Sequence, residues 1–140
     1  MMNDLSWAAT VQLVHERAKY YCEYCQTSQK VTGQAMHVEH INPNRDDHPD
    51  NLCLSCSTCS LSKAKVTSAI DPQTGAVVAL FNPRKQYWAV HFEWTDGGER
   101  SLGKTPIGRA TIERLGMNRD RIVIARRVWI RAGDHPPSFD

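Results

Sequence analysis

The sequence lacks an apolar run long enough to cross a membrane as a helix. Its first twenty residues carry charged side chains such as Asp4, Glu16 and Arg17, so they do not resemble a secretory signal peptide. Internal repeats, low-complexity segments and linker-like stretches are also missing. We therefore expect a single cytoplasmic domain over residues 1–140, with no membrane partner.

The chain also has little net charge and few cysteines. Its 17 Lys and Arg residues nearly balance 15 Asp and Glu residues, and the net charge of +2 is too small to indicate a nucleic-acid partner by itself. Five cysteines cannot all pair as disulfides, and in a reducing compartment closely spaced cysteines more often bind metal. A hydrophobic fraction of 41% is enough for a core, although small domains bury proportionally less surface.

Four of the five cysteines form two C-x-x-C pairs, Cys22 with Cys25 and Cys56 with Cys59. Each pair can supply two thiolates to a tetrahedral Zn²⁺; the alternatives are chance pairs or a redox motif. With four thiolate ligands the zinc has no open coordination position, so we expect a structural role. Cys53 lies between two leucines, and we interpret it as a small core residue.

Between the two pairs lies a short segment with side chains suited to metal binding and proton transfer, including Glu39 and His40. A carboxylate is a hard ligand for Mg²⁺ or Mn²⁺, and a neutral imidazole can accept a proton from water. Neighbouring strand residues point to opposite faces, but a pair at a strand end before Asn42-Pro43 can escape this rule. Metal-assisted hydrolysis and an ordinary surface pair are both consistent with these residues alone.

Several motifs together resemble the zinc-containing branch of the HNH endonuclease family. They are Cys22-x-x-Cys25, His37-Val38-Glu39-His40-Ile41, Asn51-Leu52 and Cys56-x-x-Cys59-x-x-x-Lys63. The resemblance covers residues 17 to about 67. It implies an α+β fold whose ββα-metal core is held together by the four-cysteine zinc site. In that core a hairpin and a helix hold one divalent cation against a scissile phosphate.

The resemblance also implies roles for individual residues. Glu39 stands at the acidic metal-ligand position, and His40 stands at the position of the general base that activates water. Asn51 stands at the central asparagine, which fixes the loop so that the histidine is aimed. Lys63 stands where it can approach a phosphate or support the site.

One position departs from the family pattern. Ser60 follows the last cysteine, where the family usually has His or Asn as its second metal ligand. Because a hydroxyl is a weaker ligand than an imidazole or an amide oxygen, we expect weaker cation binding or slower catalysis. His37 lies two residues from Glu39 on the same strand face, and we expect it to support the site rather than to bind the cation directly.

Local patterns predict the secondary structure. We expect a first helix capped by Asp4 or Ser6, with Trp7, Val11, Val14 and Ala18 on one apolar face. The remaining expected elements are strands at 36–41 and 52–54 around an exposed loop at 42–50, a helix at 61–66, strands at 76–80, 87–94 and 100–103, and helices at 105–115 and 120–132.

Residues 68–140 form a C-terminal extension with a hairpin and helices. Ile70-Asp71-Pro72, Leu80 to Arg84 and Thr105 to Thr111 resemble the tail of a bacterial HNH subgroup. One interpretation is a DNA-binding surface, formed by Arg84, Lys85, Arg109, Arg126, Arg127 and Arg131. The other is a solvated helix face and a scaffold hairpin, which we favour for the last three arginines.

We therefore expect a metal-dependent endonuclease that hydrolyses phosphodiester bonds in double-stranded DNA. The expected cofactors are structural Zn²⁺ and a catalytic Mg²⁺ or Mn²⁺, with Ni²⁺ as a further candidate. The alternatives are a nucleic-acid-binding module that has lost cleavage through Ser60, and a zinc-containing protein-interaction domain. The sequence predicts no target sequence, cleavage pattern, biological setting or oligomeric state.

Overall fold

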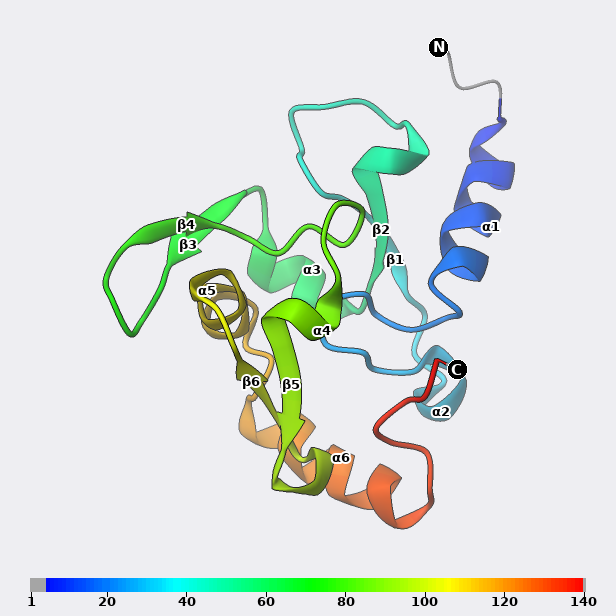
Figure 1. Cartoon of the computed structure of the whole chain (residues 1–140). Helices are drawn as coiled ribbons and strands as arrows, with labels where there is room; N and C mark the ends of the chain where they lie inside the picture. The colour runs from blue at the N-terminus through cyan, green and yellow to red at the C-terminus, as the bar shows by residue number, and fades with distance from the viewer. Residues whose placement is uncertain (1–4, 140) are drawn as a thin grey trace.

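The structure is a computed structural model that describes residues 5–139 (Figure 1), so Asp4, one of the two expected helix caps, lies outside the described residues. The helices are α1 (Trp7–Arg17), α2 (Gln29–Thr32), α3 (Ser57–Lys63), α4 (Trp88–His91), α5 (Pro106–Leu115) and α6 (Asp120–Arg131), with short 3-10 helices η1 (Pro49–Asn51) and η2 (Asp96–Gly98). The strands are β1 (His37–His40), β2 (Leu52–Ser55), β3 (Ser68–Ile70), β4 (Val77–Ala79), β5 (Phe92–Thr95) and β6 (Arg100–Gly103). None of the helices within 5–139 is long and apolar enough to span a membrane.

The strands form three separate antiparallel pairs, β1 with β2, β3 with β4 and β5 with β6. In the first pair Glu39 lies opposite Cys53, and His40 lies opposite Leu52. Figure 1 shows the helices distributed around these short sheets, which makes the domain a small α+β fold as expected.

The first sheet is followed directly by α3, so the chain order is strand, loop, strand, helix. Both strands lie where the sequence predicts them. The helix begins at Ser57 rather than at 61, because the Cys56 side chain caps it by accepting a hydrogen bond from the Cys59 backbone N–H at 3.4 Å. The second cysteine pair is therefore the first turn of α3.

The N-terminal helix lies against β2. Its start is set by Ser6, whose hydroxyl accepts a hydrogen bond from the Ala9 N–H at 3.1 Å. Thr10, Val14 and Ala18 are buried, whereas Trp7 is 51% exposed. The buried face of the helix thus begins at Thr10 and not, as the sequence predicts, at Trp7.

The extension departs from the sequence prediction at 87–94. Residues Trp88–His91 form α4, and only Phe92–Thr95 form β5. Trp88 packs on Phe92 and on Trp94, with ring centroids 5.0 and 5.4 Å apart. Trp88 and Phe92 share a face in either structure, because residues four apart align in a helix as well as in a strand. The aromatic alternation therefore could not separate the two.

The later helices begin and end as predicted. The Thr105 hydroxyl caps α5 by accepting a hydrogen bond from the Gly108 N–H at 3.1 Å. Gly116 ends the helix in the left-handed conformation, with φ of 63°. The hairpin of β5 and β6 also forms as predicted, while β3 was not predicted at all.

One hydrophobic core joins the first part of the chain to the extension. Leu52 and Leu54 of β2 belong to the same buried cluster as Phe81, Phe92 and Leu115 of the extension. Residues that are far apart in the sequence therefore bury one another, which supports a single folding unit.

Candidate functional site

The four paired cysteines meet in the core. Their Sγ atoms all lie within 4.8 Å of one another, and every one of the four residues is buried. The Sγ atoms of Cys25 and Cys56 are 3.7 Å apart, close to the edge of about 3.8 Å expected for sulfurs in a tetrahedral zinc site with Zn–S bonds of about 2.3 Å. The donor set and its spacing could therefore hold a metal such as zinc.

Different elements deliver the two halves of this cluster. Cys22 and Cys25 lie on a tight loop after α1, where the Cys22 N–H donates to the Thr27 carbonyl at 2.9 Å. Cys56 and Cys59 come from the start of α3. Burial raises the pKa of the Cys22 thiol, whereas a hydrogen bond from Cys22 lowers the pKa of Cys25. A bound cation would favour the thiolate form of all four residues.

The fifth cysteine stands apart from this cluster. Cys53 is fully buried, and its thiol donates a hydrogen bond to the Tyr24 hydroxyl at 3.5 Å. Burial raises its pKa to about 12, so the group stays a neutral thiol. The prediction of a small core residue is confirmed.

Glu39 points from β1 toward α3. One carboxylate oxygen, Oε1, accepts a hydrogen bond from the Ser60 hydroxyl at 2.7 Å, and the other, Oε2, lies 3.1 Å from the Lys63 ammonium. The Glu39 side chain is 12% exposed. Glu39, the expected acidic metal ligand, is thus in direct contact with Ser60, which occupies the position of the second ligand.

Lys63 does not take the phosphate-facing position that the sequence led us to expect. Its side chain is 1% exposed, and the ammonium donates to Glu39 and, at 3.0 Å, to the His40 carbonyl. Because α3 begins at Ser57, Lys63 is one helical turn after Cys59 and shares its buried face. Its ammonium is therefore occupied with support of the site.

His40 lies at the end of β1 and turns toward the 42–50 loop. Its Nε2 is 2.7 Å from Asp47 Oδ1, and its side chain is 35% exposed. The other ring nitrogen, Nδ1, has no hydrogen bond within the described part of the chain. Asp47 was not predicted from the sequence, because in an irregular loop no periodicity shows which aspartate faces the histidine.

Asn51 is buried and fastens the loop that follows His40. Its Oδ1 accepts from the Asn42 N–H at 3.0 Å, and its Nδ2 donates to the carbonyls of Asn42 at 3.0 Å and Asp46 at 2.8 Å. These bonds fix the loop that carries Asp47.

His37 contacts α3 and has no direct bond to Glu39. Its Nε2 lies 3.1 Å from the hydroxyl of Ser57, the first residue of α3. It therefore links β1 to the helix that carries Ser60.

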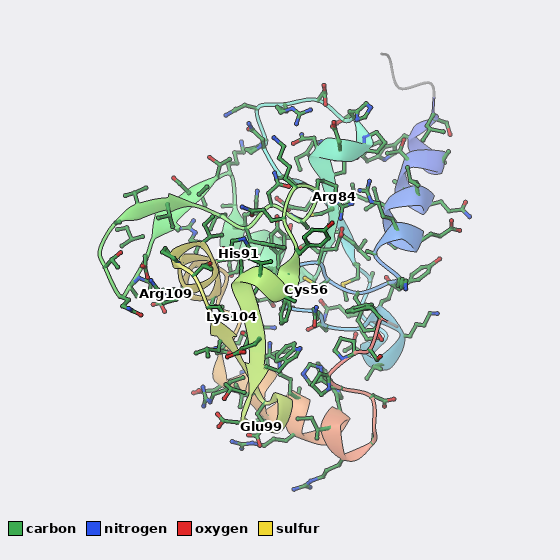
Figure 2. The ribbon with its side chains drawn as sticks, in the orientation of Figure 1. Cys56, Arg84, His91, Glu99, Lys104 and Arg109 are labelled. Carbon is green, nitrogen blue, oxygen red and sulfur yellow. The ribbon has the colours of Figure 1, made fainter. Side chains whose placement is uncertain are left out.

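Three of the arginines considered for a DNA-binding surface form ion pairs within the protein: Arg84 and Arg109, which we expected at phosphates, and Arg127, which we expected on a solvated helix face. Arg84 forms an ion pair with Glu23 of the first cysteine loop. Arg109 forms two hydrogen bonds to Asp71, at 2.9 and 2.8 Å. Figure 2 shows Arg84 on the loop after β4 and Arg109 on α5, well apart from each other. Arg127 lies 2.6 Å from Glu99.

Arg126 is neither a phosphate ligand nor a solvated residue. Its side chain is fully buried, and it donates to the carbonyls of Glu99 at 3.0 Å and Met117 at 2.7 Å. The guanidinium also stacks over Trp94 at 4.9 Å. Burial lowers its pKa to about 10, which still leaves it charged at neutral pH. We therefore correct both interpretations of this residue.

The carboxylates that hold these arginines are themselves enclosed. Asp71 is fully buried, and its hydrogen bonds from Arg109 hold the pKa of its carboxyl well below the usual range. Burial raises the pKa of Glu23, although Arg84 opposes the shift. Glu23 also accepts the Leu54 N–H at 2.8 Å, so it links the first cysteine loop, β2 and the extension.

Lys85 and Arg131 differ from these arginines, because both side chains are exposed and neither has an ion-pair partner in the 5–139 region.

Comparisons with models of known protein families, with curated proteins and with solved structures give no match for this chain.

Proposed function

We propose that the protein is a metal-dependent endonuclease that hydrolyses phosphodiester bonds in DNA, with His40 as the general base. One observation carries the proposal. Two consecutive residues at the end of β1 place a carboxylate against α3 and an imidazole against the following loop, each held by its own partners. A cation ligand and a proton acceptor are thus supplied by adjacent residues of one strand, and hydrolysis of a phosphodiester requires groups of both kinds.

The contact with Asp47 supports the role of His40. A neutral imidazole that donates from Nε2 to the carboxylate leaves Nδ1 as the acceptor. Nδ1 can then take a proton from the attacking water, and Asp47 stabilises the imidazolium that forms. Asn51 keeps the Asp47 loop in place during this step.

Glu39 is the residue that would hold the catalytic cation, with the Ser60 hydroxyl beside it. The fit is weak, because Oε2 is already neutralised by Lys63 and a neutral hydroxyl adds little affinity. Mg²⁺ commonly binds through one or two carboxylates and several waters, which suits this donor set. When bound, the cation would stabilise the charge that develops on the phosphate.

We further propose that the four-cysteine cluster binds Zn²⁺ and acts as a structural centre. It holds the loop after α1 to the start of α3, and α3 carries both Ser60 and Lys63. Zinc would therefore set the position of α3 against β1.

Cleavage of supercoiled plasmid by the zinc-loaded protein tests the proposal, with Mg²⁺, Mn²⁺ or Ni²⁺ added. We expect the native protein to cut and His40→Ala to be inactive while keeping its melting temperature. His15→Ala, a histidine change on α1 outside the site, is the matched control and should cut like the native protein. Cleavage that survives in His40→Ala would rule out this histidine as the base.

A second candidate function is a nucleic-acid-binding module without cleavage. The observation that favours it is the pairing of Glu39 with Lys63, together with Ser60 at the second ligand position. Ser60→Asn separates the two functions. Faster cutting by this variant than by an active native protein would indicate an attenuated nuclease, and cutting by the variant alone would indicate a disabled one.

A further inference from the structure

A pocket of about 310 Å³ lies between the proposed site and the C-terminal extension. Ile41 and Asn42, which follow β1, form one side of it, and Lys63 borders it. Residues 79–82 with Lys85 and Gln86 form the other side. In Figure 1 the segment between β4 and α4 runs from the β3–β4 hairpin toward the first sheet, and its residues line the pocket together with Lys63 of α3.

Three amide side chains of the pocket share one feature, namely that their oxygens already accept backbone N–H groups. Asn42 Oδ1 accepts from Asn44 at 3.0 Å, and Gln86 Oε1 accepts from Asn82 at 2.9 Å. Asn82 Oδ1 accepts from Arg84 at 2.9 Å and from Lys85 at 3.3 Å. These bonds fix the orientation of each amide and leave its NH₂ group as the part that can bind a ligand.

The charge of the pocket points to the same kind of ligand. Lys85 supplies an exposed ammonium, and neither Asp nor Glu occurs among the described residues that line the pocket. NH₂ groups and an ammonium donate hydrogen bonds and accept none. A group rich in acceptor oxygens and negatively charged therefore fits best, and the phosphate oxygens of a nucleic-acid backbone have both properties.

We propose that this pocket is a subsite for a phosphodiester group of DNA next to the scissile one. Lys85, Gln86 and Asn82 are the residues that bind this group. The proposal rests on the proposed function, because it names where the same substrate continues beyond Glu39 and His40. It also gives the extension a role, since the segment at 79–86 supplies half of the polar side chains that line the pocket, namely Asn82, Lys85 and Gln86.

Binding of a short fluorescein-labelled DNA duplex to the zinc-loaded full chain tests the subsite, measured by anisotropy without added Mg²⁺ or Mn²⁺ over a range of salt concentrations. Lys85→Gln should reduce the slope of log Kd against log salt by about 0.9, the value for one phosphate contact. Gln86→Glu keeps the oxygen that accepts the Asn82 N–H but replaces the NH₂ group by a charged oxygen, and it should weaken binding about tenfold.

Two matched controls lie outside the pocket. Lys30→Gln removes one charge from α2. Gln29→Glu makes the same amide-to-carboxylate change at a glutamine whose oxygen also accepts a backbone N–H, that of Met36. Both should bind DNA like the native protein, and melting temperatures of all variants should show that each is folded.

The outcomes separate the subsite from the nuclease. Unchanged DNA binding in both pocket variants, or no DNA binding by the native protein, would overturn the subsite, whatever the plasmid assay gives for His40. Weaker binding in the pocket variants alone would support it, even if no His40-dependent cleavage were found. Calorimetry with inorganic phosphate tests whether the pocket binds the free ion rather than a phosphodiester of DNA. If Gln86→Glu abolishes phosphate binding but leaves DNA binding unchanged, the proposal is also overturned.

Discussion

The ammonium of Lys63 lies 3.1 Å from the carboxylate of Glu39, and the two residues are 24 positions apart in the sequence. The pair joins α3 to β1, and the Lys63 side chain is almost completely buried. An ion pair in such a place holds Oε2 of Glu39 against α3, while Oε1 accepts the hydrogen bond from the Ser60 hydroxyl. The position of the proposed cation ligand therefore depends on a lysine.

Loss of this lysine should destabilise the fold. Lys63→Met leaves the Glu39 carboxylate enclosed without its cation, and we expect the free energy of unfolding to fall by about 3 kcal/mol. Lys65→Met, an exposed lysine two residues later, should cost less than about 0.5 kcal/mol. Urea denaturation measures both, and equal losses would contradict an internal role for Lys63. The double variant Glu39→Gln/Lys63→Met should recover part of the loss, because no unpaired charge remains.

Asp47 should act through His40 in the proposed reaction. Asp47→Ala removes the acceptor at Nε2, so the ring can rotate and take the wrong tautomer, and we expect kcat for DNA cleavage to fall about tenfold. Asp50→Ala removes a carboxylate of the same loop that contacts His48 rather than His40, and should leave kcat unchanged. If KM rises and kcat stays constant in Asp47→Ala, the carboxylate has no such positioning role.

Metal removal should abolish the fold if the cysteine cluster binds zinc. Cys25→Ser, or a strong chelator, should release the zinc and eliminate cooperative thermal unfolding. Cys53→Ala changes the one cysteine outside the cluster and should retain a full equivalent of zinc. A colorimetric zinc assay and circular dichroism measure these effects. A metal-free protein that melts at the native temperature would show that zinc is not needed for folding.

The neighbouring arginines Arg126 and Arg127 should differ sharply in their contribution to the free energy of unfolding. Arg126→Met leaves the carbonyls of Glu99 and Met117 without a donor, and we expect a loss of about 2–4 kcal/mol. Arg127→Met removes an exposed pair with Glu99 and should cost less than about 1 kcal/mol. The difference in urea midpoint between the two variants tests the buried position of Arg126, and a similar small loss in both would contradict it.

The sequence predictions were accurate where a structure depends on interactions between residues close together in the chain. The β1 strand, the α5 helix with its caps Thr105 and Gly116, and the two cysteine pairs were predicted, because caps, breakers and short spacings act within a few residues. The start of α3 was missed because the capping group is a cysteine side chain, which sequence rules do not treat as a cap. Trp88–His91 was missed because a spacing of four suits both a helix and a strand.

The sequence by itself determined which groups the site could contain: four thiols, a Glu-His pair at a strand end and an asparagine that fixes the next loop. Only the tertiary structure decided how the charges pair. Lys63 meets Glu39, Arg109 meets Asp71 and Arg84 meets Glu23 across 24, 38 and 61 positions of sequence. Such pairings depend on which carboxylate the packed core brings near each cation, and no local pattern encodes that. For the same reason the cations left to bind a phosphate, Lys85 foremost, could be chosen only once the fold was known.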